Sequence, residues 1–188
     1  MLNFYKFIEI VICLQSLVVS TMIPVFIVFP FAGRFNYSLE MPISWQIPTT
    51  ILLTLFFKRK IVLIAFTFYL LLGLFLIPIF HQGGSLGYLI TPNFGYLIGL
   101  YPLIEIINFS NKKNKIFIKD FLKNGILAII AMHITGITYS ILQIFYYKQI
   151  NIFLYNIGNY SLGKIGYHLL MLIPLLILIK PINYLRYK

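Results

Sequence analysis

The segment Ile77–Gly99, IPIFHQGGSLGYLITPNFGYLIG, places a polar window between two strongly apolar stretches. Its part Pro78–Asn93 contains no charged residue but offers histidine, amide, hydroxyl and several glycines. Glycine permits positive φ angles and close approach of the backbone. A small-molecule pocket has this character, being mostly apolar with a few placed polar groups. An ordinary external loop with a glycine turn is the alternative that the segment alone leaves open.

The rest of the chain is unusually apolar. Of its 188 residues, 60% are hydrophobic and 10% are charged, and the mean hydropathy is +0.91. Soluble domains carry about 25% charged residues, so this composition indicates an integral membrane protein. The length suits one domain over residues 1–188. The net charge of +11 would suggest nucleic acid in a soluble protein, but here the basic residues cluster between apolar runs. Membrane topology explains them, and we expect no nucleic-acid partner.

A helix needs about 20 apolar residues to cross the hydrocarbon core. The sequence therefore predicts an all-α bundle with six transmembrane helices, at about residues 7–31, 44–57, 61–80, 91–109, 119–146 and 162–184. The first apolar run is longer than the core of a signal peptide and is interpreted as a retained helix. Two prolines, Pro42 and Pro48, predict that Met41–Thr50 is a loop dipping toward a cavity, followed by a short helix.

The basic residues fix the expected orientation. Twelve of the fifteen lie before the first predicted helix, between the second and third, around the join of the fourth and fifth, or near the C-terminus. The remaining three are Arg34, Lys148 and Lys164. The positive-inside rule then predicts that both termini are cytoplasmic, in a multi-pass protein of the cell membrane. The single cysteine, Cys13, excludes an intrachain disulfide, and no metal-ligand cluster is evident.

The central signature resembles that of the BioY family, the biotin-binding S components of energy-coupling-factor transporters. The resemblance is clear over Met41–Tyr101 and includes the upstream stretch PISWQIPTT. It rests on Tyr69-Leu70, Gly73, Pro78, Phe80, Gly83-Gly84, Pro92-Asn93-Phe94-Gly95-Tyr96 and Gly99.

This resemblance implies a six-helix protein that binds biotin and is not an enzyme. Uptake would need a transmembrane coupling protein and two ATP-binding-cassette ATPases. The chain would hold no cofactor, with biotin as its ligand and ATP used only by the partner subunits. In agreement, the sequence contains no G-x-x-x-x-G-K-[ST] phosphate loop. A homo-oligomer is left open.

The family's first helix resembles a docking surface for the coupling protein, with small residues four apart. Ser16-x-x-x-Ser20 holds that spacing here, and such residues lie on one helix face and let backbones approach closely. Packing within the molecule is the alternative. For Gly95-x-x-x-Gly99, which has the same form, packing within the bundle is the favoured interpretation.

The start of the last helix departs from the family pattern, which has a Gly-Asp and a lysine three residues after the aspartate. Both contact the ureido end of biotin in the family. If Gly163 is the matching glycine, Lys164 stands at the aspartate position and Tyr167 at the lysine position. The carboxylate is therefore missing.

Other side chains could substitute for it. Amides pair both ways with a ureido group, Lys164 or His168 could meet the carboxylate of biotin, and aromatic rings could pack its bicyclic ring. A lysine at this place could also extend to the interface, with tyrosines in the interfacial belt. The candidate binding residues are Trp45, Gln46, Gln82, Gly83, Gly84, Tyr88, Asn93, Tyr96, Tyr160, Lys164, Tyr167 and His168.

Three alternatives to a biotin-binding component remain. The same fold could bind a different small ligand. A solitary ion-coupled carrier would need an intramembrane carboxylate, for which Glu105 is the one candidate. A small membrane enzyme would need converging catalytic groups, and the four acidic residues and three histidines form no such set in the sequence. For His133, in the middle of the fifth predicted helix, we expect an interhelical hydrogen bond.

Overall fold

The computed structural model describes residues 4–28, 38–80, 83–111, 115–147 and 150–186. In chain order its elements are α1 (Phe4–Met22), β1 (Pro24–Val28), β2 (Ser38–Ser44), α2 (Gln46–Phe56), α3 (Arg59–Phe75), the 3₁₀ turn η2 (Leu86–Ile90), α4 (Pro92–Ile98), α5 (Leu100–Asn111), α6 (Ile118–Tyr147), α7 (Ile150–Asn156), the π-helical turn η3 (Ile157–Leu162), α8 (Gly163–Leu170) and α9 (Leu172–Arg186).

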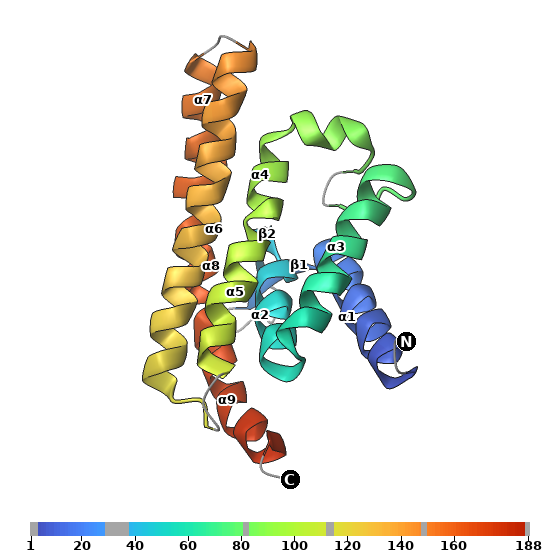
Figure 1. Cartoon of the computed structure of the whole chain (residues 1–188). Coiled ribbons are helices and arrows are strands. Elements are labelled where there is room, and N and C mark those ends of the chain that lie inside the picture. The colour runs from blue at the N-terminus through green and yellow to red at the C-terminus, as the bar shows by residue number, and fades with distance from the viewer. Residues whose placement is uncertain (1–3, 29–37, 81–82, 112–114, 148–149, 187–188) are drawn as a thin grey trace.

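The helices form a bundle in which α1, α2, α3, the pair α4 and α5, α6, and the stretch from α7 to α9 alternate in direction (Figure 1). α1 packs against α2 and α3, while α4 and α5 run in line along α6. The stretch α7–η3–α8–α9 returns beside α6. The core between them is apolar and includes the fully buried Phe66, Phe121 and Leu103. The all-helical bundle predicted from the sequence is therefore confirmed, with one small sheet added to it.

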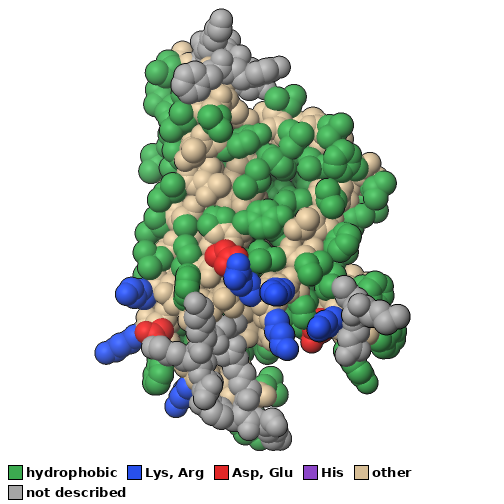
Figure 2. All heavy atoms as spheres, viewed as in Figure 1, with side chains coloured by type: hydrophobic (Ala, Val, Ile, Leu, Met, Phe, Trp, Pro, Cys, Tyr) green, Lys and Arg blue, Asp and Glu red, His purple; other side chains and the backbone are tan. Residues whose placement is uncertain are grey.

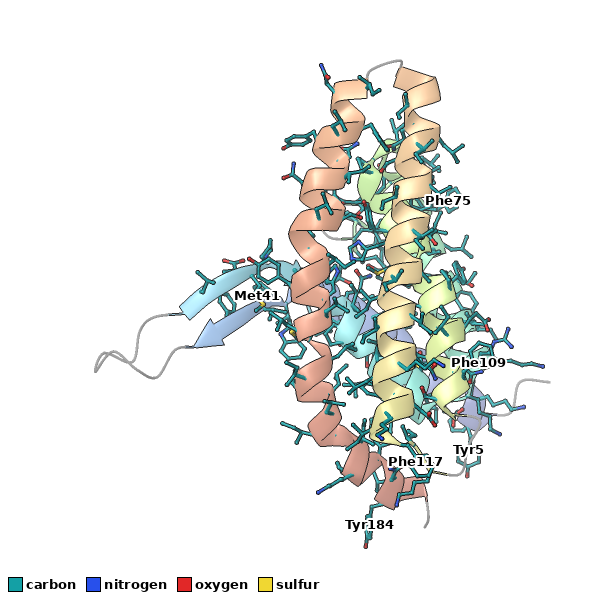
Figure 3. The ribbon with its side chains drawn as sticks, turned by 90° about the vertical axis from the view of Figure 1, so that its left-hand side faces the viewer. Tyr5, Met41, Phe75, Phe109, Phe117 and Tyr184 are labelled. Carbon is teal, nitrogen blue, oxygen red and sulfur yellow. The ribbon has the colours of Figure 1, made fainter. Side chains whose placement is uncertain are left out.

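That sheet corrects the prediction for the first helix. The helix ends at Met22, not near Phe31, and an antiparallel hairpin of β1 and β2 follows. Pro24 has no N–H to donate and disfavours helix at the residue before it. The next four residues, Val25–Val28, are β-branched or aromatic and suit a strand. The hairpin extends to one side of the bundle (Figure 3), and Val25, Met41 and Ile43 pack with Met171.

The proline-rich segment Met41–Thr50 is also not a loop. Its first part belongs to strand β2, and α2 begins at Gln46 with Pro48 in its first turn. A proline is tolerated there because the first N–H groups of a helix have no intrahelical partner. The expectation that this segment borders a cavity holds, as described below.

Three other helix boundaries also differ from the predicted ones. α3 ends at Phe75, three residues before Pro78, rather than at Phe80. The predicted fourth helix is divided at Gly99 into α4 and α5. The last helical stretch begins at Ile150, well before residue 162. These differences move helix ends but keep the order of the segments.

Gly95 in α4 and Gly99 directly after it serve packing within the bundle, as expected. A Cβ built on Gly95 would lie 2.3 Å from Cβ of Tyr139 on α6. A Cβ on Gly99 would lie 2.7 Å from the carbonyl oxygen of Met132, also on α6. The two glycines therefore set the close approach of α4 to α6 that holds Tyr96 toward the interior.

Three helical stretches among the described residues are long and apolar enough to cross a membrane: Phe4–Met22, Ile118–Ile144 and Phe153–Leu185. Many large apolar side chains on the helices are exposed, as suits contact with lipid. On the face shown in Figure 2, lysines and arginines gather at one end of the molecule. The chain is thus a multi-pass membrane protein, while six crossings and cytoplasmic termini stay predictions.

Candidate functional site

A cavity lies where the hairpin end, α2, α4 and α6 meet η3 and α8. Seven of the twelve candidate binding residues line it: Gln46, Tyr88, Asn93, Tyr96, Tyr160, Lys164 and His168. The remaining walls are mostly apolar and comprise Pro42, Ile43, Ser44, Ile47, Tyr69, Phe80, Leu97, Leu100 and Met132. Segments more than a hundred positions apart in the sequence therefore converge on one mostly apolar site with a few polar groups, the usual make-up of a ligand pocket.

The glycine turn of the opening segment holds Tyr88 against the cavity. Gly83 has a φ of +138°, which glycine adopts readily and other residues rarely do. A Cβ on Gly84 would lie 2.5 Å from Cα of Pro78, so only glycine fits this approach. The N–H of Ser85 donates to the carbonyl of Gly73 at 2.9 Å, which joins the turn to the end of α3. Gly83 and Gly84 thus shape the turn and do not line the cavity.

Tyr88 is buried within a chain of aromatic contacts. Its ring centroid lies 4.7 Å from that of Phe80, which in turn lies 5.3 Å from that of Tyr69. Burial raises the pKa of the Tyr88 hydroxyl above its ordinary value, and Tyr69 and Tyr160 add smaller contributions in the same direction. The hydroxyl therefore stays neutral at physiological pH.

The amide of Gln46 is held by Tyr69, a buried residue of the central signature that was not among the candidate binding residues. Nε2 of Gln46 donates to the hydroxyl of Tyr69 at 3.2 Å, and that hydroxyl also bonds Oγ1 of Thr21 at 3.0 Å. Tyr69 is fully buried. Because Nε2 is committed to Tyr69, the amide carbonyl of Gln46 is fixed in orientation and forms a preorganised acceptor.

The opposite wall comes from η3 and α8. Nζ of Lys164 lies 5.1 Å from the centroid of the Tyr160 ring, within the range of a cation–π contact. Lys164 therefore extends over an aromatic wall of the cavity. His168 follows one helical turn later on the same face and is buried. π-helical turns such as η3 are frequent at functional sites.

Behind this wall runs a chain of hydrogen bonds that links three segments. The hydroxyl of Tyr96 bonds Oγ of Ser161 at 3.0 Å, and Oγ of Ser161 bonds Nδ1 of His133 at 3.0 Å. Nε2 of His133 bonds Nδ1 of His168, also at 3.0 Å. The expected interhelical bond of His133 is thereby confirmed. The sequence did not predict that this chain of hydrogen bonds reaches His168, a residue of the cavity wall. The only signal for the chain was a histidine, His133, within an apolar run.

The other candidate residues lie outside the cavity or outside the described residues. Trp45 borders a separate groove beside α1. Tyr167 packs against the hairpin cluster of Val25, Met41 and Ile43. Gln82 lies outside the residues that the structure describes, so its place in a site stays a prediction.

No aspartate or glutamate is among the described residues that line the cavity. The missing carboxylate noted in the sequence is therefore not replaced by an acid from another described segment. Within the same ranges, no three histidine, cysteine or acidic side chains are grouped so as to hold a metal ion. Lys164 is the one lysine or arginine on the described cavity wall.

A second groove runs along α1 and includes both candidate docking serines. It is bordered by Gln15, Ser16, Val19, Ser20, Ile23, Trp45 and Thr49. Ser16 is half-buried, whereas Ser20 is 4% exposed. Both hydroxyls bond carbonyls of their own helix, at 2.8 and 2.9 Å. Ser16 thus contributes to an open surface, while Ser20 also serves packing within the molecule.

Comparison with solved structures supports the fold. The chain is similar to the crystal structure of an S-component for biotin from an ECF-type ABC transporter, with a TM-score of 0.55 and 18% identity. The similarity covers 100% of this chain and 95% of that one. Comparison with curated proteins gave no match. The BioY family matches residues 5–173, nearly the whole chain. The protein therefore belongs to the BioY family, whose members are substrate-binding transport proteins and not enzymes.

Proposed function

We propose that this protein binds biotin in the cavity and delivers it inward as the substrate-binding component of an energy-coupling-factor transporter. The observation that carries this proposal is the convergence of Gln46, Asn93, Tyr160 and Lys164 on one cavity of the BioY fold. These four residues come from α2, α4, η3 and α8, so the site exists only in the folded bundle.

The lining suits the chemistry of biotin. The bicyclic ring and the aliphatic chain of biotin need apolar and aromatic walls, which Tyr88, Tyr96 and Leu97 supply. The ureido group donates two N–H groups and accepts at one carbonyl, so it needs both acceptors and donors. The amides of Gln46 and Asn93 provide both kinds of group.

Two orientations of biotin agree with these residue types. In one, the carboxylate meets the ammonium of Lys164 and the ureido group meets the amides of Gln46 and Asn93. In the other, the ureido carbonyl meets Lys164 and the carboxylate points away from it. Burying a carboxylate carries a large desolvation cost even beside a cation, whereas the neutral ureido group carries a smaller one. This difference favours the second orientation.

Transport would depend on partner subunits that bind and hydrolyse ATP. A transmembrane coupling protein would dock on α1 at the groove around Ser16, in the plasma membrane. The outer face of α1 supports this part of the proposal, since Phe4, Phe7, Val19 and Met22 are all more than half exposed. A large apolar surface of this kind suits either lipid or another membrane helix.

The alternative of a solitary ion-coupled carrier loses its main candidate residue. Glu105 on α5 forms an ion pair with Arg59 at the start of α3, with 2.6 Å between Oε1 and Nη2. Both side chains are more than a third exposed. Glu105 is therefore a paired surface carboxylate and does not border the cavity.

Uptake of labelled biotin by cells that lack their own biotin transporter tests the proposal. We expect this chain, produced together with a coupling protein and its ATPases, to restore uptake. An Asn93→Ala variant should reduce it, whereas Thr138→Ala, a change on an exposed position of α6, should not. Absence of uptake by a correctly inserted chain with a functional coupling module would contradict the proposal.

A further inference from the structure

The hydrogen-bonded chain behind the cavity ends at His168, a residue of the cavity wall. His133 uses both ring nitrogens, one for Ser161 and one for Nδ1 of His168. His133 is 2% exposed and does not line the cavity, whereas His168 does. Nε2 of His168 makes no hydrogen bond to a residue that the structure describes. Among the described residues, every fully buried side-chain nitrogen or oxygen has a hydrogen-bond partner, so Nε2 of His168 is not fully buried. Nε2 of His168 therefore borders open space.

Each bond in this chain needs one donor and one acceptor, so a neutral histidine pair has two consistent arrangements. In the first, Ser161 donates to His133, His133 donates to His168, and Nε2 of His168 carries a proton toward the cavity. In the second, Nδ1 of His168 donates to His133 and Nδ1 of His133 donates to Ser161. Nε2 of His168 then presents a lone pair. The two tautomers must change together, because a mixed arrangement places two protons or two lone pairs face to face.

Lys164 favours the second arrangement. Lys164 lies on the cavity wall, one helical turn before His168 on the same face of α8. A nearby cation favours a lone pair turned toward it and a proton turned away from it. Lys164 and His168 then offer a donor and an acceptor side by side. This pair matches the adjacent C=O and N–H of a cyclic urea.

We propose that the Tyr96–Ser161–His133 chain, together with the ammonium of Lys164, holds His168 in its Nδ1–H tautomer, so that Nε2 of His168 accepts a ureido N–H of the ligand in place of the missing carboxylate. This inference rests on the proposed function, since it concerns the recognition of biotin. His168 would touch the ligand, while His133 and Ser161 act through it as positioning residues.

The tautomers can be observed directly. The chain contains three histidines, so selective ¹⁵N labelling gives few ring signals, and a His→Gln change at each position assigns them. In the ligand-free protein we expect protonated Nδ1 and unprotonated Nε2 for both His133 and His168. The Ser161→Ala variant should mix the tautomers of both histidines. Thr135→Ala, which removes a hydroxyl that bonds only its own helix, should leave them unchanged.

Ligand binding supplies the second readout. Biotin methylated on the ureido nitrogen that meets Nε2 should bind on the order of 10- to 100-fold more weakly than biotin. In His168→Asn, which keeps a group near Nδ1 but none near Nε2, that methylation should change affinity little. His168→Gln, which keeps an acceptor near the place of Nε2, should retain part of the discrimination.

The outcomes separate this inference from the proposed function. Biotin binding with Nε2 of His168 protonated, or with no effect of methylation at either ureido nitrogen, would overturn the inference and leave biotin as the ligand. Absence of biotin binding by a folded protein would overturn the proposed function and the inference together.

Discussion

Replacement of Lys164 by methionine removes the cation from the cavity wall and keeps an unbranched side chain. In the arrangement proposed here, the ammonium donates to the ureido carbonyl of biotin. A hydrogen bond from a charged donor contributes about 1.5–3 kcal/mol. The variant should therefore bind biotin on the order of 10- to 100-fold more weakly. Calorimetric titration of the purified protein in detergent measures this change.

The methyl ester of biotin decides which end of the ligand meets Lys164. If the ureido carbonyl does, Lys164→Met should weaken the binding of biotin and of its ester by the same factor. If the carboxylate does, a gross attraction of about 4 kcal/mol is available at a separation of about 4 Å and an effective dielectric constant of about 20. The methyl ester has no carboxylate and lacks this attraction even in the unchanged protein. Lys164→Met would then weaken the binding of free biotin but not that of the ester.

A loss confined to free biotin would therefore refute the proposed orientation. Lys180→Met is a matched control, because Lys180 is an exposed lysine of α9 outside the cavity. It should bind both ligands as the unchanged protein does.

Further changes test the turn, the buried phenol and the docking surface. Gly84→Ala should destabilise the protein by more than about 2 kcal/mol in thermal unfolding, because its Cβ would meet backbone at 2.5 Å. A Cβ added at Gly166 would meet no atom within 4 Å, so Gly166→Ala should stabilise α8 by about 0.5–1 kcal/mol. Since the pKa of Tyr88 is raised on folding, its contribution to stability should be complete below pH 10, the ordinary pKa of the phenol, and fall above it. Tyr88→Phe should reduce this fall in the free energy of unfolding above pH 10. If the variant shows the same dependence of stability on pH as the unchanged protein, the prediction is contradicted. Ser16→Leu should impair biotin uptake but not biotin binding in detergent, whereas Thr138→Leu should impair neither; equal uptake would argue against docking on α1.

Much of the bundle could be predicted because hydropathy marks each helical segment and the basic clusters mark the turns between them. The hairpin escaped this reasoning for a physical reason. Residues Pro24–Val28 are as apolar as a membrane helix, so hydropathy continues the first helix through them. Proline and the β-branched residues were the available signals against a continued helix. The packing of the strands on Met171, which stabilises the hairpin, is visible only in the folded structure.

Residue type alone predicted part of the cavity lining. Lys164, Tyr160 and Asn93 were found in this way, and all of them line the cavity. The hydrogen-bonded chain was not, because its bonds join residues 65, 28 and 35 positions apart. Ser161 has no special feature in the sequence, and only the folded arrangement places it between Tyr96 and His133.

Titration calorimetry with biotin measures whether this cavity recognises biotin. The protein should be purified from biotin-depleted cells, since a tightly bound ligand can remain with it. We expect saturable one-to-one binding of biotin, competition by dethiobiotin, which keeps the ureido ring, and weaker binding by Asn93→Ala. A folded, monodisperse sample that binds neither ligand would contradict the claim that this cavity recognises biotin.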